Sequence, residues 1–401
     1  MYRIIRGQMM EHYTKLAREV KCLLEDEKIK MSDILHSTNH KNANCLYDFV
    51  NGKREVLKDF ENTIGIARCS FPDTYEDYLE DFVYSIADRE PNRMVIVEAM
   101  EWADASQRSE LTDFLVDKLK NCRNLKCKEY GNVYFLHRQL TKGEITAHEA
   151  LVASGKLGLK QMETVVFSRL MVLYKYLELR QFDTLSDMAK DIHSELVEKD
   201  SFISKSYSSR IQTLLANMSL TQGDLVNTRK HAELAISESD NPRFLAFGYL
   251  HLGNSYLFES YEKSKEKLLL GMECAKNHPE RFKQLRRSMV FLNNYWNKGK
   301  TYLNHESNET EDIQGIIYNH IQNGRKEAAL DMLQKLEDQK QNDNLKGYHY
   351  YFKGLIDGNI ANFYLSAKHF KLSGDKFCVT LPLVELQKHG ENAQLLELLT
   401  I

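Results

Sequence analysis

Apolar residues recur at helical spacing from about residue 121 onward, in pairs of segments joined by short polar turns. The first segment of each pair carries aromatic residues and often a glycine, whereas the second carries Ala and Leu. The clearest pair spans residues 347–375. Counted from Gly347, five residues fall at the tetratricopeptide positions 4, 8, 20, 24 and 27: Tyr350, Gly354, Ser366, Phe370 and Ser373. Small residues at such positions let two helices approach closely, so the pattern predicts a helical hairpin.

The same pattern of paired helical segments recurs along the chain. A second clear unit covers residues 243–275, in which Leu252, Gly253 and Tyr256 keep the Leu-Gly-x2-Tyr spacing. Weaker units cover residues 130–153, 165–192, 207–236 and 311–336. Periods of roughly 30–45 residues are typical of repeat solenoids. We therefore predict an all-α chain with a tetratricopeptide-like right-handed superhelix, whose concave surface suits an extended peptide. An all-helical globule is the alternative, but it would not explain the recurrence.

The segment in front of the repeats, residues 30–54, reads KMSDILHSTNHKNANCLYDFVNGKR. Its pattern predicts a short helix at 31–35, a polar turn at 36–40 and a second helix at 41–50. This layout is typical of an N-terminal helix-turn-helix of the phage-repressor kind, whose second helix enters the major groove. Apolar residues in and after the two helices can pack a small core: Ile34, Leu35, Leu46, Phe49, Val50, Leu57 and Phe60.

Polar residues around the second predicted helix are candidates for DNA contact. Lys41, Asn42 and Asn44 are expected to be exposed at its start, where Asn can read adenine and Lys can read guanine or phosphate. Gly52 is expected to end the helix in the left-handed conformation. Two cations that follow are expected to face backbone phosphate: Lys53 and Arg54. A plain surface hairpin is the alternative, because Ser, Asp and Asn are common there too.

These patterns predict four parts of the chain. Residues 1–72 form a helix-turn-helix DNA-binding domain, 73–120 a helical connector, 121–384 the peptide-sensing repeats, and 385–401 a C-terminal capping or dimerisation segment. The last segment is apolar where a repeat array normally needs a polar cap. We expect its leucines to be buried, either in their own chain or in a partner: Leu395, Leu396, Leu398 and Leu399.

Composition limits the possible functions. The 401 residues are 28% charged and 42% hydrophobic, and the formal net charge is −3, which excludes a generally basic nucleic-acid coat. Any DNA contact must therefore be local. The first 54 residues carry ten Lys or Arg and seven Asp or Glu, so the front of the chain is mildly basic. No run approaches the ~18 apolar residues that a membrane span needs, and we expect no membrane association.

The sequence carries no motif that points to catalysis. The seven cysteines are scattered, and without a signal peptide they predict free thiols in a reducing cytoplasm. Cys122, Cys127 and His137 could be taken for a metal cluster, but their spacing is loose and no second pair follows. Phosphate-binding loops, dinucleotide fingerprints and hydrolase motifs do not occur. We therefore expect no cofactor, no metal and no enzymatic activity.

Asparagines recur inside apolar stretches of the predicted first helices. Asn217 lies in LLANMSL, Asn254 in YLHLGNS, and Asn293 and Asn294 in FLNNYW. An amide amid apolar residues must find hydrogen bonds. In a tetratricopeptide groove it can bind a peptide bond of a ligand, and the alternative is a hydrogen bond between helices. Recurrence on successive units favours the ligand for the set.

Four collinear segments carry a resemblance to a known family: EYGNVYFLHRQLTKGEITAHEA (129–150), NPRFLAFGYLHLGNSYLFESYE (241–262), FLNNYW (291–296) and SGDKFCVTLPLVELQKHGENAQLLELL (373–399). They resemble the arbitrium receptors of Bacillus phages, transcription regulators that sense a short secreted phage peptide and decide between lysis and lysogeny. The resemblance runs from about residue 44 to the C-terminus, whereas the extension through about residue 28 departs from the family pattern. It implies a DNA-binding head, a peptide groove and a homodimer formed through the C-terminal region, acting in the host bacterial cytoplasm. In the family, the peptide-free form binds an operator and activates a lysis-promoting transcript, and the peptide blocks this.

The resemblance also implies which residues bind the peptide: Asn217, Arg243, Asn254, Leu257, Asn344 and Asp375. Arg243 is expected to take a peptide carboxylate or carbonyl, and Asp375 a peptide cation, through charge-assisted hydrogen bonds. Thr221 departs from relatives that carry a further Asn, so peptide specificity can differ there.

Other functions are compatible with the same predicted helix-turn-helix and repeats. A host-type pheromone-controlled regulator would differ in its operator, and a tetratricopeptide adaptor would inhibit a protein partner without touching DNA. A phosphatase-like relative would need a catalytic amide and carboxylate cluster that the sequence does not place. Salt-dependent binding to duplex DNA would separate a regulator from an adaptor.

Overall fold

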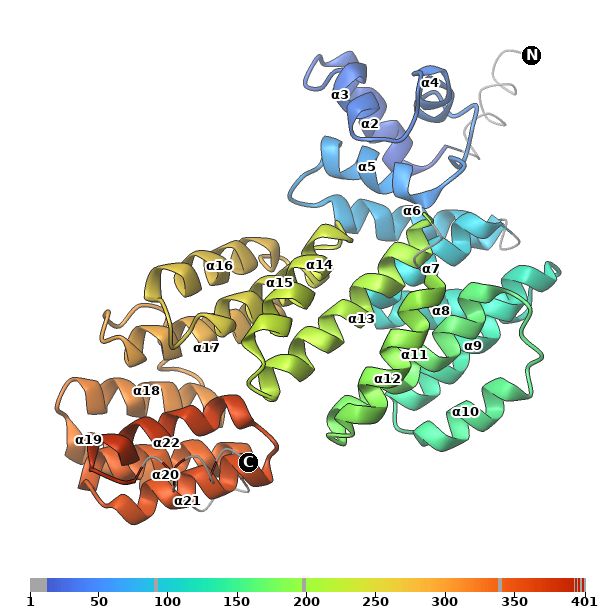
Figure 1. The fold of residues 1–401 in the computed structure, drawn as a ribbon. Helices are drawn as coiled ribbons and strands as arrows, with labels where there is room; N and C mark the ends of the chain where they lie inside the picture. Colours follow the sequence, from blue (N-terminus) through green and yellow to red (C-terminus); the bar gives the residue numbers. More distant parts are fainter. Residues whose placement is uncertain are drawn as a thin grey trace, which may run out of the picture. The chain divides into compact units, whose positions relative to one another are not determined.

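The computed structural model describes residues 13–89, 93–196, 200–337 and 341–392, together with residues 394, 396 and 399. Within these residues the chain folds into α-helices joined by turns and forms no β-strand (Figure 1). The predicted all-α class is therefore confirmed. Among the same residues, no helix is long and apolar enough to cross a membrane.

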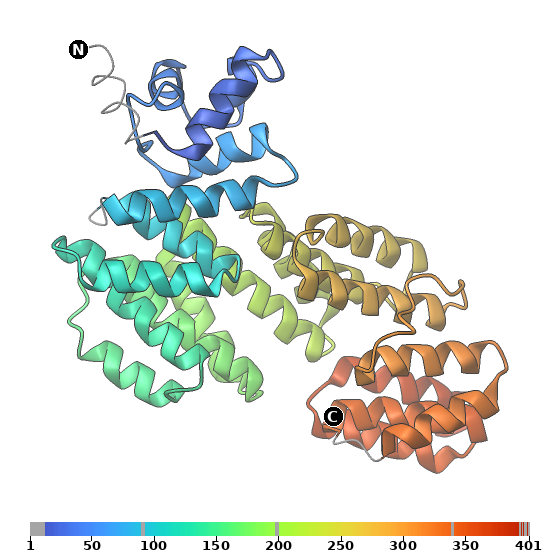
Figure 2. The same cartoon turned by 180° about the vertical axis from the view of Figure 1, so that it is seen from behind.

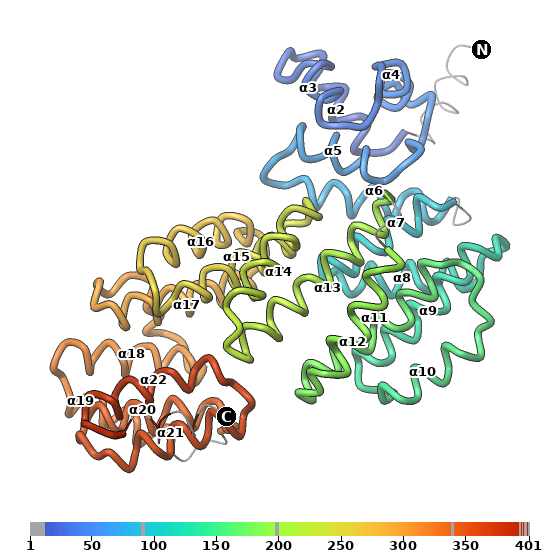
Figure 3. The backbone as a smooth tube through the Cα atoms, in the orientation of Figure 1, coloured from blue at the N-terminus to red at the C-terminus, as the bar shows by residue number. Residues whose placement is uncertain are grey.

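The helices follow one another as successive antiparallel hairpins over much of the chain (Figures 2 and 3). The first helices are α2 (Lys15–Glu25), α3 (Met31–His36), α4 (Asn44–Val50), α5 (Phe60–Ser70), α6 (Tyr75–Arg89), α7 (Met94–Ala105), α8 (Ser109–Lys120), α9 (Leu125–Thr141), α10 (Ala147–Gly155), α11 (Met162–Glu178) and α12 (Phe182–Leu196). The remaining helices are α13 (Phe202–Thr221), α14 (Leu225–Ser237), α15 (Pro242–Ser255), α16 (Tyr261–Cys274), α17 (Pro279–Tyr295), α18 (Thr310–Gln322), α19 (Lys326–Glu337), α20 (Asp343–Asp357), α21 (Ile360–Leu372) and α22 (Lys376–Lys388).

The chain forms two compact units. Unit 1 comprises residues 1–175 and 191–207, and unit 2 comprises residues 176–190 and 208–401. The chain passes from one unit to the other inside α11, α12 and α13. The domain boundaries that the sequence predicts after residues 72 and 120 both fall inside unit 1.

Helices α2 to α5 of unit 1 form a small head around an apolar core. The amphipathic helix α2 buries Leu16 and Val20. The N-terminal extension therefore supplies helix α2 of the head. Six of the core residues that the sequence predicts are buried: Ile34, Leu46, Phe49, Val50, Leu57 and Phe60. Leu35 is only half-buried.

Helix α4 begins later than the sequence predicts. It starts at Asn44 rather than residue 41, because the side-chain oxygen of Asn42 accepts the backbone N–H of Asn44 at 3.2 Å. Asn side chains compete with helical carbonyls for backbone N–H groups in this way. Lys41 and Asn42 consequently lie in the turn before the helix.

The C-terminal end of α4 has the predicted left-handed glycine. Gly52 has φ +70°, and its N–H donates to the carbonyl of Phe49 at 3.0 Å while the N–H of Lys53 donates to that of Asp48 at 2.8 Å. These two bonds are those of a Schellman motif. The hydroxyl of Tyr13 donates to the carbonyl of Val50 at 2.6 Å. The extension thus also holds the end of α4.

A half-buried carboxyl joins the head to the next helices of unit 1. Glu98 on α7 accepts the backbone N–H of Phe60, the first residue of α5, at 2.6 Å. Burial raises the pKa of Glu98 to about 7 despite this hydrogen bond, and the nearby Asp59 and Glu61 raise it further. Because its ordinary pKa is 4.5, the folded state binds more protons than the unfolded state between these values. The contribution of protonated Glu98 to the free energy of unfolding is therefore lost as the pH rises through about 7.

Replacing Glu98 by Gln should raise the free energy of unfolding above pH 7 by about 1–2 kcal/mol, because the amide stays neutral and can still accept the Phe60 N–H. Below about pH 4.5 the two proteins should be equally stable, since Glu98 is then protonated in both states. Thermal unfolding of both proteins at pH 5 and pH 8 measures this. A Glu98→Gln variant that is less stable at pH 8 would contradict the prediction.

The hairpins of unit 2 pack through the small residues that the sequence singles out. A Cβ atom on Gly347 of α20 would lie 2.5 Å from the ring of Phe370 on α21. The hydroxyl of Ser366 donates to the carbonyl of Gly347 at 2.8 Å. On Gly253 of α15, a Cβ would lie 2.8 Å from the side chain of Leu268 on α16. Both predicted clear units are thus closely packed helical hairpins.

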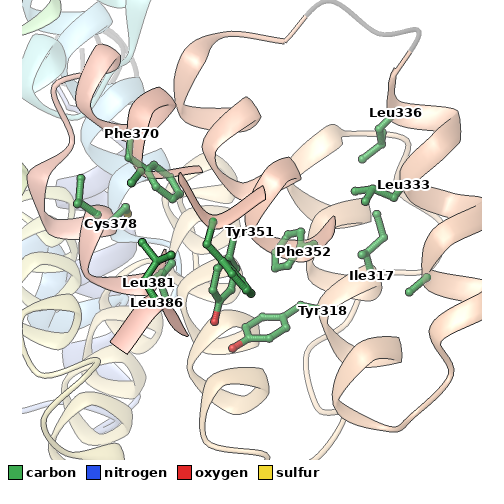
Figure 4. Packing of buried hydrophobic residues seen from close by; sticks show 14 of the residues in the cluster. Ile317, Tyr318, Leu333, Leu336, Tyr351, Phe352, Phe370, Cys378, Leu381 and Leu386 are labelled. Atoms are coloured by element: carbon green, nitrogen blue, oxygen red, sulfur yellow. The ribbon is translucent and has the colours of Figure 1, made fainter. Parts of the chain in front are cut away.

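The C-terminal hairpins share one apolar core. It includes the rings of Tyr318 on α18 and of Tyr351 and Phe352 on α20, beside Leu381 and Leu386 of α22 (Figure 4). Buried residues of α19 and α21 complete the core, so all five helices from α18 to α22 contribute to it and form one body.

Part of the predicted dimerisation segment lies against this core. Leu396 is 8% exposed and belongs to the core, and Leu399 packs against it partly buried. Leu395 and Leu398 lie outside the described residues. At least two of the four leucines are therefore covered by their own chain.

Candidate functional site

A cavity of about 580 Å³ lies within unit 2. Side chains of α13, α15, α17, α18, α20 and α22 line it, together with the turn between α11 and α12. Cavities of this size hold small molecules or part of a short peptide. Five of the residues that the resemblance assigns to peptide binding line it: Asn217, Asn254, Leu257, Asn344 and Asp375.

The sixth residue, Arg243, does not line the cavity. Arg243 and Asn254 lie on the same helix, α15, but eleven residues separate them. At 1.5 Å per residue they are about 16 Å apart along the helix axis. The Arg243 guanidinium instead lies 5.6 Å from the ring centroid of Phe247.

Asp375 is held firmly at the cavity wall. One carboxylate oxygen accepts the backbone N–H of Cys378 at 3.0 Å and so caps α22, and the other accepts the Asn344 side-chain amide at 2.9 Å. The hydroxyl of Tyr348 lies 3.0 Å from the Cys378 sulfur. Burial raises the pKa of the Cys378 thiol well above its usual value, so it stays protonated. A carboxylate in this position can accept a further bond from a cationic ligand group.

The four asparagines that lie inside apolar stretches of the sequence differ in their surroundings. Asn294 donates to the carbonyl of Gly315 at 2.8 Å, and Asn293 accepts from the Tyr261 hydroxyl at 3.0 Å. For this pair the alternative of interhelical hydrogen bonds is confirmed. Asn217 and Asn254 instead line the cavity.

An ion cluster in the cavity wall was missed by the sequence analysis. The carboxylate of Asp312 on α18 is 2% exposed and accepts hydrogen bonds from Arg286, Arg287 and Ser307. Burial by itself would raise the pKa of Asp312, but the bonds from Arg287, Ser307 and Arg286 outweigh it and hold the pKa at about 2. The adjacent arginines in the sequence were the only visible signal, and they do not reveal which carboxylate they meet.

The cavity combines balanced charge with an aromatic wall. Its cations and anions are equal in number: Arg180, Arg286, Arg287, Glu311, Asp312 and Asp375. Its aromatic wall comes from α17, α20, α22 and the residues after α15: Phe258, Phe291, Tyr348, Phe352 and Phe377. Such a lining suits a ligand that carries polar backbone, both signs of charge and some apolar surface.

The head presents a separate polar surface around α4. All five residues predicted to contact DNA are exposed: Lys41, Asn42, Asn44, Lys53 and Arg54. Tyr47, which the sequence analysis did not select, is 50% exposed on the same helix. One oxygen of Asn42 is engaged by the Asn44 N–H, so Asn42 has a local structural role as well.

Cys122 and Cys127 are buried, and burial raises the pKa of Cys127 to about 11. Within the part of the chain that the structure describes, no three His, Cys, Asp or Glu side chains gather where they could hold a metal ion.

Comparisons with known proteins give one consistent result. A family described as AimR transcriptional regulator-like matches residues 76–388. The AimR transcriptional regulator of Bacillus phage SPbeta is 35% identical over 378 residues, which are 94% of this chain and 97% of that protein. The AimR transcriptional regulator of Bacillus phage phi3T is 33% identical over 362 residues, 90% of this chain and 94% of that protein.

Solved structures agree with the sequence comparison. The structure of SeMet-phAimR is 31% identical, with a TM-score of 0.88 over 96% of this chain and 100% of that chain. The structure of phAimR-Ligand is also 31% identical, with a TM-score of 0.68 over 88% of this chain and 99% of that chain.

Proposed function

Because this chain belongs to the AimR transcriptional regulator-like family, we propose that it is a phage transcription regulator controlled by a short secreted peptide. Its head binds operator DNA, its cavity in unit 2 binds the peptide, and the outcome sets the choice between lysis and lysogeny. It works in the cytoplasm of the host bacterium.

The observation that carries the proposal is the composition of the cavity. Residues far apart in the sequence, Asn217, Asn254 and Asp375, meet there with an aromatic wall and balanced charge. Amides can bind the donors and acceptors of a peptide backbone, and Asp375 can bind a cationic side chain. The structure of one relative, phAimR-Ligand, has been solved with a ligand.

Control of DNA binding by the peptide requires two conformations. The peptide must bind one of them more tightly, because a ligand with equal affinity for both shifts nothing. The DNA-bound form would be the one that the peptide disfavours.

We also propose a homodimer, since paired heads fit two operator half-sites. Leu395 and Leu398 remain candidates for the partner contact. Leu396 is a weaker candidate because it is buried in its own chain.

The proposal is tested by capture of genomic DNA fragments on the purified protein, followed by release with synthetic peptides encoded in the reading frames beside its gene. We expect salt-dependent capture of a few fragments and their release by one peptide. Failure to bind any DNA would favour a tetratricopeptide adaptor, and release by a host-encoded peptide would favour the host-type regulator.

Replacing Asp375 by Ser should weaken binding of the releasing peptide about 10- to 100-fold, because a charge-assisted hydrogen bond contributes about 1.5–3 kcal/mol. Ser is a good helix N-cap, so α22 should stay capped. Replacing Asp375 by Ala should weaken the peptide similarly and cost about 1 kcal/mol of stability as well. Calorimetry and thermal unfolding separate the two effects, and full affinity in Asp375→Ser would exclude a cation at this position.

A further inference from the structure

His251 on α15 is a buried histidine whose ring lines a cavity. Its side chain is 5% exposed and lines the cavity of unit 2. Among the described residues, neither of its ring nitrogens has a hydrogen-bond partner. The ring lies nearly parallel to that of Phe247 one turn earlier, with the centroids 6.0 Å apart. On that side the ring therefore packs against an apolar group.

Such an arrangement is costly unless something else supplies the missing partner. A buried polar group without a hydrogen bond loses the free energy of its hydration and gains nothing in return. Burial, reinforced by the nearby Arg281, lowers the pKa of His251 to about 4, so the ring is neutral at physiological pH. A neutral imidazole offers one N–H donor and one acceptor nitrogen.

A second buried polar group, one turn further along α15, also lacks a hydrogen-bond partner among the described residues. The side-chain oxygen of Asn254 is buried, lines the same cavity and has no hydrogen-bond partner within the described chain. Residues three apart lie on the same helix face. His251 and Asn254 therefore form one polar strip in an otherwise packed helix.

We propose that His251 is a further specificity-determining residue of this site, and that it binds one backbone peptide group of the ligand beside the already assigned Asn254. The ligand N–H donates to the Asn254 oxygen or the free imidazole nitrogen, and the ligand carbonyl accepts from the imidazole N–H. A cationic ligand group is disfavoured here because the charge of Arg281 already acts on the His251 ring. This inference rests on the proposed peptide-binding function.

Two substitutions separate a ligand role from a structural one. His251→Leu removes both nitrogens, and His349→Leu is the matched control. His349 is also buried, at 6% exposed, but it lies on α20 beside Glu337 and does not line the cavity. The probe is the tightest binder by calorimetry among synthetic peptides from the reading frames beside the gene.

We expect His251→Leu to weaken this peptide about 5- to 50-fold, because it leaves a buried peptide group without its partner. Its peptide-free Tm should be unchanged or higher, since an unsatisfied buried polar group has been removed. His349→Leu should keep the peptide affinity within about twofold of the wild type, because it changes nothing in the cavity. Recovery of affinity in His251→Asn or His251→Gln would identify which nitrogen acts.

An N-methyl scan of the peptide identifies the group bound. Methylating the one backbone N–H that this subsite holds should weaken binding to the wild type, and the loss should shrink in His251→Leu, as coupled partners require. If His251→Leu loses affinity only for peptides with a free C-terminal carboxylate, and not for amidated ones, the subsite binds a carboxylate and the inference is wrong.

The remaining outcomes are distinct. Unchanged peptide affinity in His251→Leu, or a lower Tm of the peptide-free variant without a selective loss of affinity, would overturn this inference alone. Binding of no peptide from the panel to the wild-type protein would overturn the proposed function and this inference with it.

Discussion

Replacing Asp312 by Ala is expected to lower the free energy of unfolding by about 3–5 kcal/mol. The substitution leaves Arg286, whose side chain is 13% exposed, without its carboxylate, whereas Arg287 keeps the carboxylate of Glu309 at 2.6 Å. A charge that has lost its water and its partner costs far more than the net contribution of the pair. Because the cluster joins α17 to α18 in the cavity wall, the loss should also weaken ligand binding.

Urea denaturation followed by circular dichroism measures this loss. Asp331→Ala on α19 is the matched control, since Asp331 is exposed in the same unit and its removal should change stability by less than about 0.5 kcal/mol. Equal stability of the two variants would contradict the assigned role of Asp312.

The pH dependence gives a second check on Asp312. Its pKa is about 2 in the folded state and 3.8 ordinarily, so its contribution is fully present above about pH 4. The contribution is lost as the pH falls through about 2. The difference in stability between the wild type and Asp312→Ala should shrink over the same interval.

Replacing Lys41 and Asn44 together by Ala is expected to weaken operator binding by about 2–5 kcal/mol, because each base contact contributes about 1–3 kcal/mol. Both side chains are exposed, so the Tm should hardly change. Asn44 opens α4 and is the stronger candidate for reading a base. Lys41 lies in the preceding turn and is a candidate for reading guanine or phosphate.

A mobility-shift titration against the captured operator fragment and an unrelated duplex measures this effect. Lys28→Ala is the control, since it removes one exposed positive charge from the head outside α4 and its turns. Replacing Lys53 and Arg54 should instead weaken both duplexes alike and reduce the salt dependence. Operator affinity that survives in the Lys41 and Asn44 double variant would show that α4 does not read the operator.

The sequence by itself determined the features that depend on neighbouring residues. Helical hairpins follow from apolar spacing, and the close contact of α20 with α21 follows from Gly347, Ser366 and Phe370 at their repeat positions. Gly52 was predictable because only glycine adopts φ > 0 without a steric cost. The resemblance added three cavity residues that the apolar pattern alone did not select: Leu257, Asn344 and Asp375.

Tertiary structure alone decided which polar side chains form hydrogen bonds within the fold and which can bind a ligand. Asn293 and Asn254 occupy similar sequence contexts, yet Asn293 is hydrogen-bonded between helices, whereas the side-chain oxygen of Asn254 has no partner in the part of the chain that the structure describes. Arg243 shares a helix with Asn254, yet it lies too far along the axis to line the cavity. The packing of separate helices places Asp312 beside Arg286 and Arg287, and it leaves the ring nitrogens of His251 without a hydrogen-bond partner among the described residues. Helix periodicity specifies a face, but the neighbour opposite that face is set by packing between segments distant in sequence, which a single sequence does not encode locally.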